Sequence, residues 1–528
     1  MRKMNRKIAL ILIPMLLAST AILGVRFASA QATLKVGVIG PYYLAQWHAN
    51  QGGMEGGAEL AAMDINASGG INIGGTHYNI QIVKANEWAY DPTTKTYDVV
   101  KAKAEIHRLL DDEGCKFIIG GFRTEVTDPI IEEVMDYNAA HPGQEAIFFI
   151  NGASTDWLCR DFSDPANATR YHWLFRINPI NSTMLYKNVL GYVIGYLIPK
   201  KLAPMYGGVV KYGYMVEDLA WTVGISMHLQ YVGLGPNATW VYGARTPTGT
   251  TDFSSYLSDA AAHGVRLLIL AYTLPDCAYL ISQWGFGQFN MLPVGIDVWG
   301  QQGIYPTQTG GYCNYEVEME FVGTRTPITP QAVAFWDNFL GNFSATPLYT
   351  AWGAYNGFIT LKQALESVGS LNATDIVSYL ETHETMVLNG KAKFTENHDV
   401  FSMSYGPIWP DGYTRAMMVQ WINTSNPSAS APYTHGFVKN VVSPVDQVYS
   451  QKTRIPPWMY SLSDWDLNFD GVIDIRDIST AGRAFGSTPG NPRWNIEADI
   501  NLDGVIDIRD ISAIGRNFGK SAPVWPLP

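Results

Sequence analysis

The chain reads Leu34-Lys-Val-Gly-Val-Ile-Gly40 near its start, a β-branched run that ends in glycine. Such a run is typical of a buried β-strand. Residues 53–65 follow with apolar side chains at helical spacing (Met54, Ala58, Ala61, Ala62 and Ile65), and the helix signal stops at Ala67-Ser-Gly-Gly70. A buried strand followed by such a helix indicates the first unit of an α/β fold.

The alternation of strand and helix repeats along the chain. Strands are predicted at residues 78–83, 117–120 and 146–150, and helices at 101–110 and 129–137, the second helix with Asp128 at its N-cap and Pro129 at its first position. The cycle restarts with strands at 212–216, 239–242, 265–271 and 293–296. Two consecutive α/β sets predict two lobes, each a parallel sheet with helices on both faces.

Ligands of open parallel sheets bind beyond the carboxyl ends of the strands. The loops in question follow Gly40, Gly120, Ile150, Val216, Ala271 and Ile296. Thr124 lies in one of them, just before the predicted helix capped by Asp128, whose N-terminal N–H groups and dipole favour an anion. We therefore expect this loop to hold a negatively charged part of a ligand.

Four segments resemble the leucine/isoleucine/valine-binding family of periplasmic receptors. They are Gly57-Ala-Glu-Leu-Ala-Ala-Met-Asp-Ile-Asn-Ala-Ser-Gly-Gly-Ile71, Ala89-Tyr-Asp-Pro92, Ile118-Ile-Gly120 with Thr124 and Asp128-Pro129 beyond it, and Asn151-Gly-Ala-Ser154. The first is the most specific, and the resemblance runs from about Leu34 to about Gly412. It implies a type I periplasmic-binding fold, in which two lobes joined by three crossing strands close on a ligand. It also implies a non-enzymatic protein that delivers amino acids, amides or other small organics to an ABC importer.

Carried over by position, the resemblance implies a set of ligand contacts. Thr124 and Ser154 match hydroxyl residues that hold the ligand carboxylate, Gly152 matches a residue offering backbone groups, and Asp297 matches an acid that pairs with the ligand ammonium. Aromatic or wall positions are matched by Trp221, by Tyr272 with Thr273, and by Trp47. Structural roles stay open, because loop hydroxyls satisfy turns, acids cap segments and tryptophans fill cores.

Two departures from the family concern the kind of ligand. The family often has serine beside the matching hydroxyl, whereas Arg123 and Glu125 flank Thr124 here, and a charge pair would admit a more polar ligand. The loops are also rich in tryptophan, at Trp157, Trp284 and Trp299, which would suit a flat or aromatic ligand.

The composition bounds the class of protein. The chain has 528 residues, of which 47% are hydrophobic and 16% charged, so wholesale disorder is excluded and two or three domains are expected. The formal charge of −11 argues against a nucleic-acid partner. HExxH, GxSxG and Walker A patterns are absent, and the ten histidines lack ligand spacing. We interpret the adjacent acids Glu217 and Asp218 as surface charge.

The N-terminus carries an export signal. A basic segment (Arg2, Lys3, Arg6 and Lys7) precedes an apolar run over residues 8–23, and Ala28-Ser-Ala30 supplies a small-x-small cleavage site. An uncleaved membrane anchor is the alternative, but the run is short for a spanning helix and ends in Arg26. We expect a protein that is secreted, held at the cell surface or periplasmic.

Export permits disulfides and glycans. Pairing of Cys115 with Cys159 and of Cys277 with Cys313 is favoured because each pair falls within one lobe, but spacing alone does not prove it. The short Asn-x-Ser/Thr pattern, which also arises by chance, occurs at Asn66, Asn167, Asn181, Asn237, Asn342, Asn372 and Asn423.

The C-terminal part contains the most specific motif. Asp466-Leu-Asn-Phe-Asp-Gly-Val-Ile-Asp-Ile-Arg-Asp477 is followed by Asp499-Ile-Asn-Leu-Asp-Gly-Val-Ile-Asp-Ile-Arg-Asp510. Oxygen side chains at the first, third, fifth, ninth and last positions, with glycine at the sixth and a carbonyl at the seventh, follow the EF-hand calcium pattern. The predicted ligands are Asp466, Asn468, Asp470, Val472, Asp474 and Asp477 in one loop, and Asp499, Asn501, Asp503, Val505, Asp507 and Asp510 in the other.

Each loop runs into one short amphipathic stretch, and no helix pattern precedes it. Loop-plus-helix, twice, with Asp instead of Glu at the last loop position, resembles the dockerin domain. The resemblance implies two calcium ions, calcium-dependent folding and docking onto a cohesin module. Partner choice would depend on Ile475-Arg476 and Ile508-Arg509, where the isoleucines depart from the Ser/Thr often found. Metal binding would supply stability that so small a core lacks.

The predicted organisation is a signal peptide over residues 1–30, a two-lobed ligand-binding domain over 31–455, a linker over 456–463 and a dockerin domain over 464–522. We expect an extracytoplasmic receptor that passes an amino acid or related small ligand to an ABC permease and is attached to a cohesin-bearing partner. A sensory or adhesive module, or an extracellular enzyme in a cohesin–dockerin assembly, are the alternatives, and the missing catalytic pattern disfavours the enzyme most.

Overall fold

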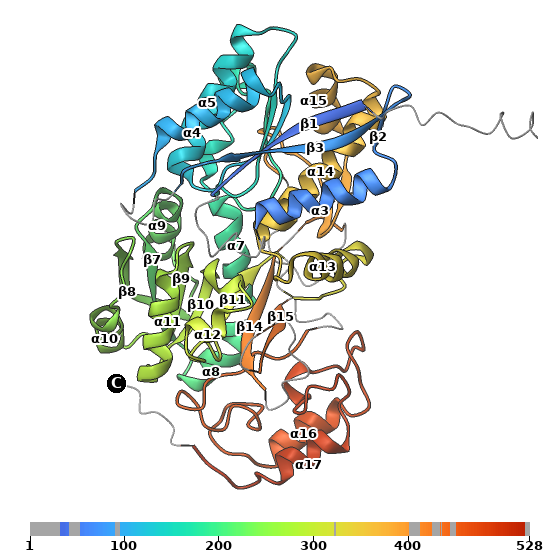
Figure 1. Cartoon of the computed structure of the whole chain (residues 1–528). Helices are drawn as coiled ribbons and strands as arrows, with labels where there is room; N and C mark the ends of the chain where they lie inside the picture. Colours follow the sequence, from blue (N-terminus) through green and yellow to red (C-terminus); the bar gives the residue numbers. More distant parts are fainter. Residues whose placement is uncertain are drawn as a thin grey trace, which may run out of the picture.

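A computed structural model describes residues 32–41, 53–89, 96–321, 324–400, 412–414, 416–424, 433, 436–443 and 450–522. The predicted signal peptide, Trp47 and residues 90–92 lie outside the described residues. Two sheets with flanking helices form two lobes, and a small module with helices α16 (Ile475–Arg483) and α17 (Ile508–Gly515) lies beyond the second lobe (Figure 1).

The first lobe is built on one mixed sheet, in the order β2-β3-β1-β4-β5-β6. Its strands are β1 (Ala32–Gly40), β2 (Ile71–Ile73), β3 (Thr76–Asn86), β4 (Phe117–Gly120), β5 (Ile147–Ile150) and β6 (Leu174–Arg176). Neighbouring strands run parallel except β2 and β3, which form an antiparallel hairpin. The strands predicted from the apolar runs are therefore present, and their carboxyl ends share one edge of the sheet.

Side chains of this sheet divide between two cores because successive residues of a strand face opposite sides. Val36 and Ile119 belong to the core shared with α3 (Met54–Ala67) and α14 (Tyr349–Val368). Ile118 and Phe148 belong to the core shared with α4 (Val99–His107) and α5 (Thr124–Ala140). Gly57 lies where α14 crosses α3, since a Cβ there would come within 2.0 Å of the Ala351 carbonyl oxygen.

The second lobe has the strand order β15-β14-β11-β10-β9-β7-β8. Its strands are β7 (Val210–Glu217), β8 (Ala238–Thr246), β9 (Leu267–Tyr272), β10 (Leu292–Asp297), β11 (Val317–Glu320), β14 (Met417–Asn423) and β15 (Phe437–Ser443). Strands β7 to β11 are parallel, and β14 and β15 complete the sheet as antiparallel strands. The last two strands lie inside residues 31–455, the range predicted for the two-lobed domain, although no strand was predicted at either position.

The remaining elements connect and cover these sheets. They are η1 (Arg108–Asp112), η2 (Asp156–Leu158), α6 (Pro165–Arg170), α7 (Ser182–Tyr192), η3 (Val193–Leu202), α8 (Ala203–Met205), η4 (Ala220–Thr222), α9 (Val223–Tyr231), α10 (Ser254–Ala262), α11 (Asp276–Gly287), η5 (Trp299–Gln301), α12 (Tyr305–Gln308), α13 (Pro330–Phe343), α15 (Ala373–Thr382), β12 (Thr385–Val387), β13 (Gly390–Ala392) and η7 (Ile496–Ala498). The chain passes between the lobes from β6 to α7, from β11 back to α14, and again before β14.

Helix α5 begins earlier than the sequence indicated. It starts at Thr124, so Thr124 is its first residue and Pro129 lies inside it, whereas we predicted a start at Pro129 with Asp128 as the cap. Asp128 instead forms an ion pair with Arg160. The prediction was wrong because the backbone just before Thr124 is held by Glu87, a residue distant in the chain, which no local pattern reveals.

The favoured disulfides are not formed, and all four cysteines are free and buried. Cys115 precedes β4 at the amino edge of the first sheet, whereas Cys159 follows β5 at the carboxyl edge. Membership of one lobe therefore does not bring these two sulfur atoms together.

Within the described residues, we find no helix with the length and apolar character needed to cross a membrane.

Candidate ligand site and calcium loops

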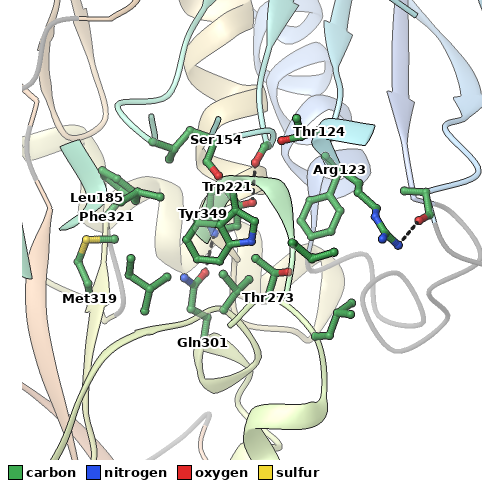
Figure 2. A pocket seen from close by; sticks show the side chains of 18 of the residues that line it. Arg123, Thr124, Ser154, Leu185, Trp221, Thr273, Gln301, Met319, Phe321 and Tyr349 are labelled. Carbon is green, nitrogen blue, oxygen red and sulfur yellow. Dashed lines mark hydrogen bonds between the residues drawn. The ribbon is translucent and has the colours of Figure 1, made fainter. Parts of the chain in front are cut away.

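A cavity lies between the two lobes, at the carboxyl ends of strands from both sheets (Figure 2). Its lining is Ala89, Phe122, Arg123, Thr124, Glu125, Gly152, Ser154, Ile180, Leu185, Leu219, Trp221, Thr273, Leu274, Ile296, Val298, Gln301, Met319, Phe321 and Tyr349. The space between these residues that holds no protein atoms has a volume of about 700 Å³, which includes the part open to solvent. Most of the lining is apolar or aromatic, as is usual for a small-molecule site.

The predicted ligand residues divide into two groups. Those that line the cavity are Thr124, Gly152, Ser154, Trp221 and Thr273. Tyr272 lies elsewhere: it is fully buried, and its hydroxyl oxygen is 2.9 Å from Thr246 Oγ1. Tyr272 ends β9 with its ring in the core of the lobe, so only the next residue reaches the cavity.

Two hydroxyl groups stand on the first-lobe wall of the cavity. Thr124 Oγ1 lies 2.7 Å from Thr155 Oγ1, and this contact fixes the position of the Thr124 side chain. Ser154 follows β5 and lies close to Thr124 in the cavity wall (Figure 2). Hydroxyl groups donate well to a carboxylate, so this wall suits an acidic ligand group.

Gly152 is required by close packing beside these hydroxyls. A Cβ at this position would lie 2.9 Å from the Gly121 carbonyl oxygen and 3.0 Å from the Phe122 ring. The Gly152 carbonyl accepts a hydrogen bond from the Tyr349 hydroxyl at 3.0 Å. The backbone at this glycine thus holds the Tyr349 ring against the cavity, and the sequence had not indicated Tyr349.

A buried acid holds the backbone just before α5 from inside the lobe. Glu87 accepts hydrogen bonds from the backbone N–H groups of Phe122 at 2.7 Å and Arg123 at 2.9 Å, and from the Thr127 hydroxyl at 3.3 Å. Burial raises the pKa of Glu87 to about 7, against these hydrogen bonds. Glu87 therefore fixes the turn that leads into α5, whose first residue is Thr124. Glu87 was missed, and its only sequence signal is an acid just after a strand.

Arg123 and Glu125 form an ion pair at the mouth of the cavity. Arg123 Nε lies 3.1 Å from Glu125 Oε2, and the guanidinium stacks over the Tyr97 ring at 4.7 Å. Glu125 Oε1 also accepts from the Ala220 N–H at 3.4 Å. Because Glu125 belongs to the first lobe and Ala220 to the second, this contact bridges the two lobes beside the cavity.

Glu217 organises the opposite wall of the cavity. Its carboxylate accepts from the Trp221 indole Nε1 at 2.7 Å and from the Thr273 backbone N–H at 3.0 Å. Glu217 is fully buried, and burial raises its pKa to about 7. The interpretation of Glu217 as surface charge was wrong, because the strand end turns inward, whereas its neighbour Asp218 is exposed and pairs with Arg245.

Asp297 does not line the cavity, although the resemblance placed it against a ligand ammonium. It is fully buried at the end of β10 and accepts from the Tyr305 hydroxyl at 2.7 Å and from the Trp299 N–H at 2.9 Å. Burial raises the pKa of Asp297 above its usual range. The Asp297 carboxyl group is hydrogen-bonded within the short turn that follows β10, so it is not available to pair with a charged group of the ligand.

Asp297 belongs to a buried group of acids inside the second lobe. The Tyr305 hydroxyl oxygen also lies 2.9 Å from Glu316 Oε2, and Lys439 pairs with Glu318 at 3.2 Å and with Glu320. Burial raises the pKa values of Glu316 and Glu318 well above their usual range. Lys439, which lies in β15, balances the negative charge of these β11 side chains.

The two predicted calcium loops have matching conformations. In the first, the Gly471 N–H donates to Asp466 at 2.9 Å, and in the second the Gly504 N–H donates to Asp499 at 3.0 Å. Both loops pass through a left-handed residue at the fourth position, Phe469 with φ of 56° and Leu502 with φ of 63°. The loops therefore share the turn that an EF-hand-type site needs.

The acids of these loops fit a bound cation. The first-position and last-position aspartates (Asp466, Asp477, Asp499 and Asp510) are all buried, and Asp466 Oδ1 has no hydrogen-bond partner. Buried carboxylates gathered in this way cost free energy unless a positive charge joins them. Asp477 and Asp510 each also close a capping box at the start of the following helix, so a cation there would also tie the loop to its helix.

The C-terminal module is packed onto the second lobe. Glu497 of η7 pairs with Lys201, which is 1% exposed, and accepts from the Tyr196 hydroxyl. The segment 456–463, predicted as a linker, is partly buried, and its Tyr460 hydroxyl donates to Asp466. The first calcium loop is thus hydrogen-bonded to the segment that joins it to the second lobe.

A two-lobed α/β body with a cavity between its lobes, followed by paired acidic loops, defines a solute-binding receptor with a calcium-binding module. The chain belongs to the periplasmic binding protein family, whose model matches residues 33–405. Residues 465–519 match the dockerin type I domain. The chain is a ligand-binding receptor of the leucine/isoleucine/valine-binding type with a dockerin domain, and not an enzyme.

Solved structures share the fold of the body. The leucine-, isoleucine-, valine-, threonine- and alanine-binding protein of Brucella ovis has a TM-score of 0.59 at 17% identity, over 77% of this chain and 94% of that chain. A Streptococcus pneumoniae branched-chain amino acid binding protein with isoleucine has a TM-score of 0.57 at 17% identity, over 78% and 99%. A solute-binding protein of R. palustris with benzoate has a TM-score of 0.57 at 14% identity, over 77% and 95%. No curated protein matches the sequence.

Proposed function

We propose that this protein is an exported receptor that binds a small organic acid between its lobes and delivers it to an ABC permease. The observation that carries the proposal is the cavity itself, in which the Thr124 and Ser154 hydroxyls stand opposite Trp221. Hydroxyl donors suit a carboxylate, and the aromatic and aliphatic walls suit an apolar remainder.

The cavity favours an apolar ligand over a polar one. Its second-lobe wall consists largely of apolar side chains (Leu219, Trp221, Leu274, Ile296, Val298, Met319 and Phe321). The charge pair that flanks Thr124 is internally compensated, and Asp297 is turned away. A branched-chain or aromatic amino acid, or an aromatic carboxylate, therefore fits the lining, and a ligand with a charged side chain does not.

The dockerin domain would hold this receptor at the cell surface. Its partner would be a cohesin module, and its docking would require calcium in the loops that begin at Asp466 and Asp499. The same attachment also suits a sensory or adhesive receptor, for which no permease is needed. Co-purification with a permease from the membrane of the native cell separates the two roles.

Isothermal titration of the mature protein in saturating calcium tests the ligand proposal. Leucine, isoleucine, phenylalanine and benzoate are the probes, with glutamate, whose side chain is charged, as the comparison. We expect one of the apolar probes to bind at one site, with an affinity that falls about tenfold or more in Thr124→Val, because a hydrogen bond to a charged group is lost. Thr239→Val, at an exposed position of β8, is the matched control and should leave binding unchanged. Binding of none of the probes, or equal binding to Thr124→Val, would reject the proposal.

A further inference from the structure

Three potential metal ligands converge in the first lobe, far along the chain from the calcium loops. His172 lies in the turn before β6, Glu381 in the last turn of α15, and His398 in the turn that pairs with β6 on its other side. Their ligand atoms all lie within 4.8 Å of one another. Sequence spacing did not reveal them, because 381 and 398 come from elements that reach β6 only in the folded lobe.

The His398 ring is held firmly in one orientation. Its Nδ1 lies 3.1 Å from the Leu174 carbonyl oxygen, which only accepts hydrogen bonds, so Nδ1 carries a proton. The ring stacks on Phe175 with centroids 4.0 Å apart and an interplanar angle of 5°, and it meets the edge of Phe162 at 4.9 Å. With Nδ1 used for the backbone, Nε2 is the nitrogen presented to Glu381. A carbonyl that fixes a histidine tautomer in this way is a common support of protein metal ligands.

The distances in this group match those around a tetrahedral ion. His398 Nε2 is 3.0 Å from Glu381 Oε1, and His172 Nδ1 is 3.7 Å from the same oxygen. Ligand atoms bound to one tetrahedral zinc ion at about 2.0–2.1 Å lie about 3.3 Å apart. Small side-chain movements of two partly exposed residues would therefore close the group on an ion, while His398 stays fixed.

Two of the three residues are partly exposed to solvent, so a metal ion could enter and leave the group. His398 is 2% exposed as a side chain, whereas His172 and Glu381 are 31% and 38% exposed. The carboxylate of Glu381 supplies the negative charge that such an ion needs.

We propose that His172, Glu381 and His398 form a site for a zinc-like divalent transition metal, with a fourth position open to water. Two imidazole nitrogens and one carboxylate select zinc, cobalt or nickel over calcium, which takes six or more oxygen ligands. The receptor therefore binds two classes of metal independently, calcium in the dockerin loops and a nitrogen-bound metal in the first lobe.

The position of the site gives the metal a mechanical role. The Arg176 N–H, at the end of β6 where the chain passes to α7 in the second lobe, donates to the His398 carbonyl at 2.9 Å. Glu381 is carried by α15, which packs on α14. A bound ion would join these segments at one end of an inter-lobe crossing and stabilise the first lobe against unfolding.

The test uses the full, tag-free protein in saturating calcium, titrated with zinc chloride by calorimetry and checked by metal analysis after dialysis. We expect one zinc per chain in addition to calcium, and a rise in the melting temperature on zinc addition. Cobalt in place of zinc should give the intense visible absorption of a tetrahedral site. His172→Ala and Glu381→Gln, both at partly exposed positions, should weaken zinc binding about tenfold or more and abolish the thermal shift.

His263→Ala is the matched control, because His263 is half exposed and lies 3.4 Å from Asp259 as an ordinary surface pair. It should bind zinc as the unmodified protein does. An absence of zinc binding in calcium would show that Glu381 and His398 form only a proton-linked ion pair, and would overturn the proposal. Zinc binding that is unchanged in both His172→Ala and Glu381→Gln would overturn it equally.

Discussion

Trp221 donates its indole N–H to Glu217 at 2.7 Å, which ties a wall of the ligand cavity to a buried carboxylate four positions earlier in the chain. The same carboxylate accepts from the Thr273 N–H. The polar atoms of both wall residues are thus used within the protein, and their apolar surfaces are left for the ligand. Glu217 determines how the second lobe meets whatever binds between the lobes.

Trp221→Phe should keep an aromatic wall but remove one donor from Glu217. We expect a loss of about 1–3 kcal/mol in the free energy of unfolding, because a buried acceptor loses its partner. Ligand affinity should fall further in Trp221→Ala than in Trp221→Phe. Urea unfolding and calorimetric titration measure the two effects. Trp240→Ala, at an exposed position of β8, is the control, and an equal loss there would contradict the assignment.

Stability should fall as the pH rises from about 4.5 to 7 through the buried acid Glu217. Its folded-state pKa is about 7 and its unfolded value about 4.5, so the folded state binds more protons in this window. The contribution is fully present below the unfolded pKa and is lost as the pH rises through the folded pKa. With 1.36 kcal/mol per pKa unit, the decline is about 3 kcal/mol.

Glu217→Gln should remove this part of the pH dependence, because glutamine does not titrate. Urea unfolding at pH 5 and pH 8, with calcium saturating at both, measures the difference for each protein. Glu87→Gln provides a parallel case, since burial raises the pKa of Glu87 to the same value. A variant whose stability declines with pH as steeply as that of the unmodified protein would show that Glu217 is ionised throughout.

Lys439→Met should be strongly destabilising. The change removes the cation that faces Glu318 and Glu320 in the closed interior of the second lobe, and leaves buried negative charge uncompensated. Breaking a buried ion pair from one side costs about 3–5 kcal/mol. The double variant Lys439→Met with Glu320→Gln should recover part of this loss in thermal unfolding. A double variant less stable than the single one would contradict the pairing.

Removal of calcium should unfold the C-terminal module and leave the two lobes folded. The buried aspartates Asp466 and Asp499 repel their neighbours without a cation, whereas the lobes have their own cores. Titration of the chelated protein with calcium, followed by tryptophan fluorescence, should show two bound ions. Asp503→Ala should leave one ion in the first loop. A module that stays folded in excess chelator would contradict the prediction.

Glu497→Gln should loosen the module from the second lobe. Lys201 is almost completely buried, and without Glu497 its ammonium group has lost its carboxylate partner. We expect a cost of about 3 kcal/mol and faster proteolytic cleavage near residue 456, both measured in saturating calcium. Glu396→Gln is the control at a surface position. Unchanged cleavage would mean that the packing of apolar side chains alone holds the module.

Much of the fold followed from local pattern. Apolar runs placed β4 and β5 to within a residue, and the helical spacing after Gly53 placed α3, because burial of one face imposes these periods. The site was predicted in part: the strand-end rule marked the loops after Gly120 and Ile150, and the family resemblance named Thr124 and Ser154 within them, both of which line the cavity. Asp297 and Tyr272 lie at strand ends too, yet their side chains turn into the core.

The sequence by itself determined the α/β class, the two lobes and the paired calcium loops, because each depends on residues that are neighbours along the chain. Only the tertiary structure decided how the cavity and the His172–Glu381–His398 group are assembled. Glu87 holds the backbone just before a helix that starts at Thr124, and Lys439 neutralises acids of β11 from a strand more than a hundred positions later. Such contacts depend on how distant elements pack, and local sequence patterns carry no record of that packing.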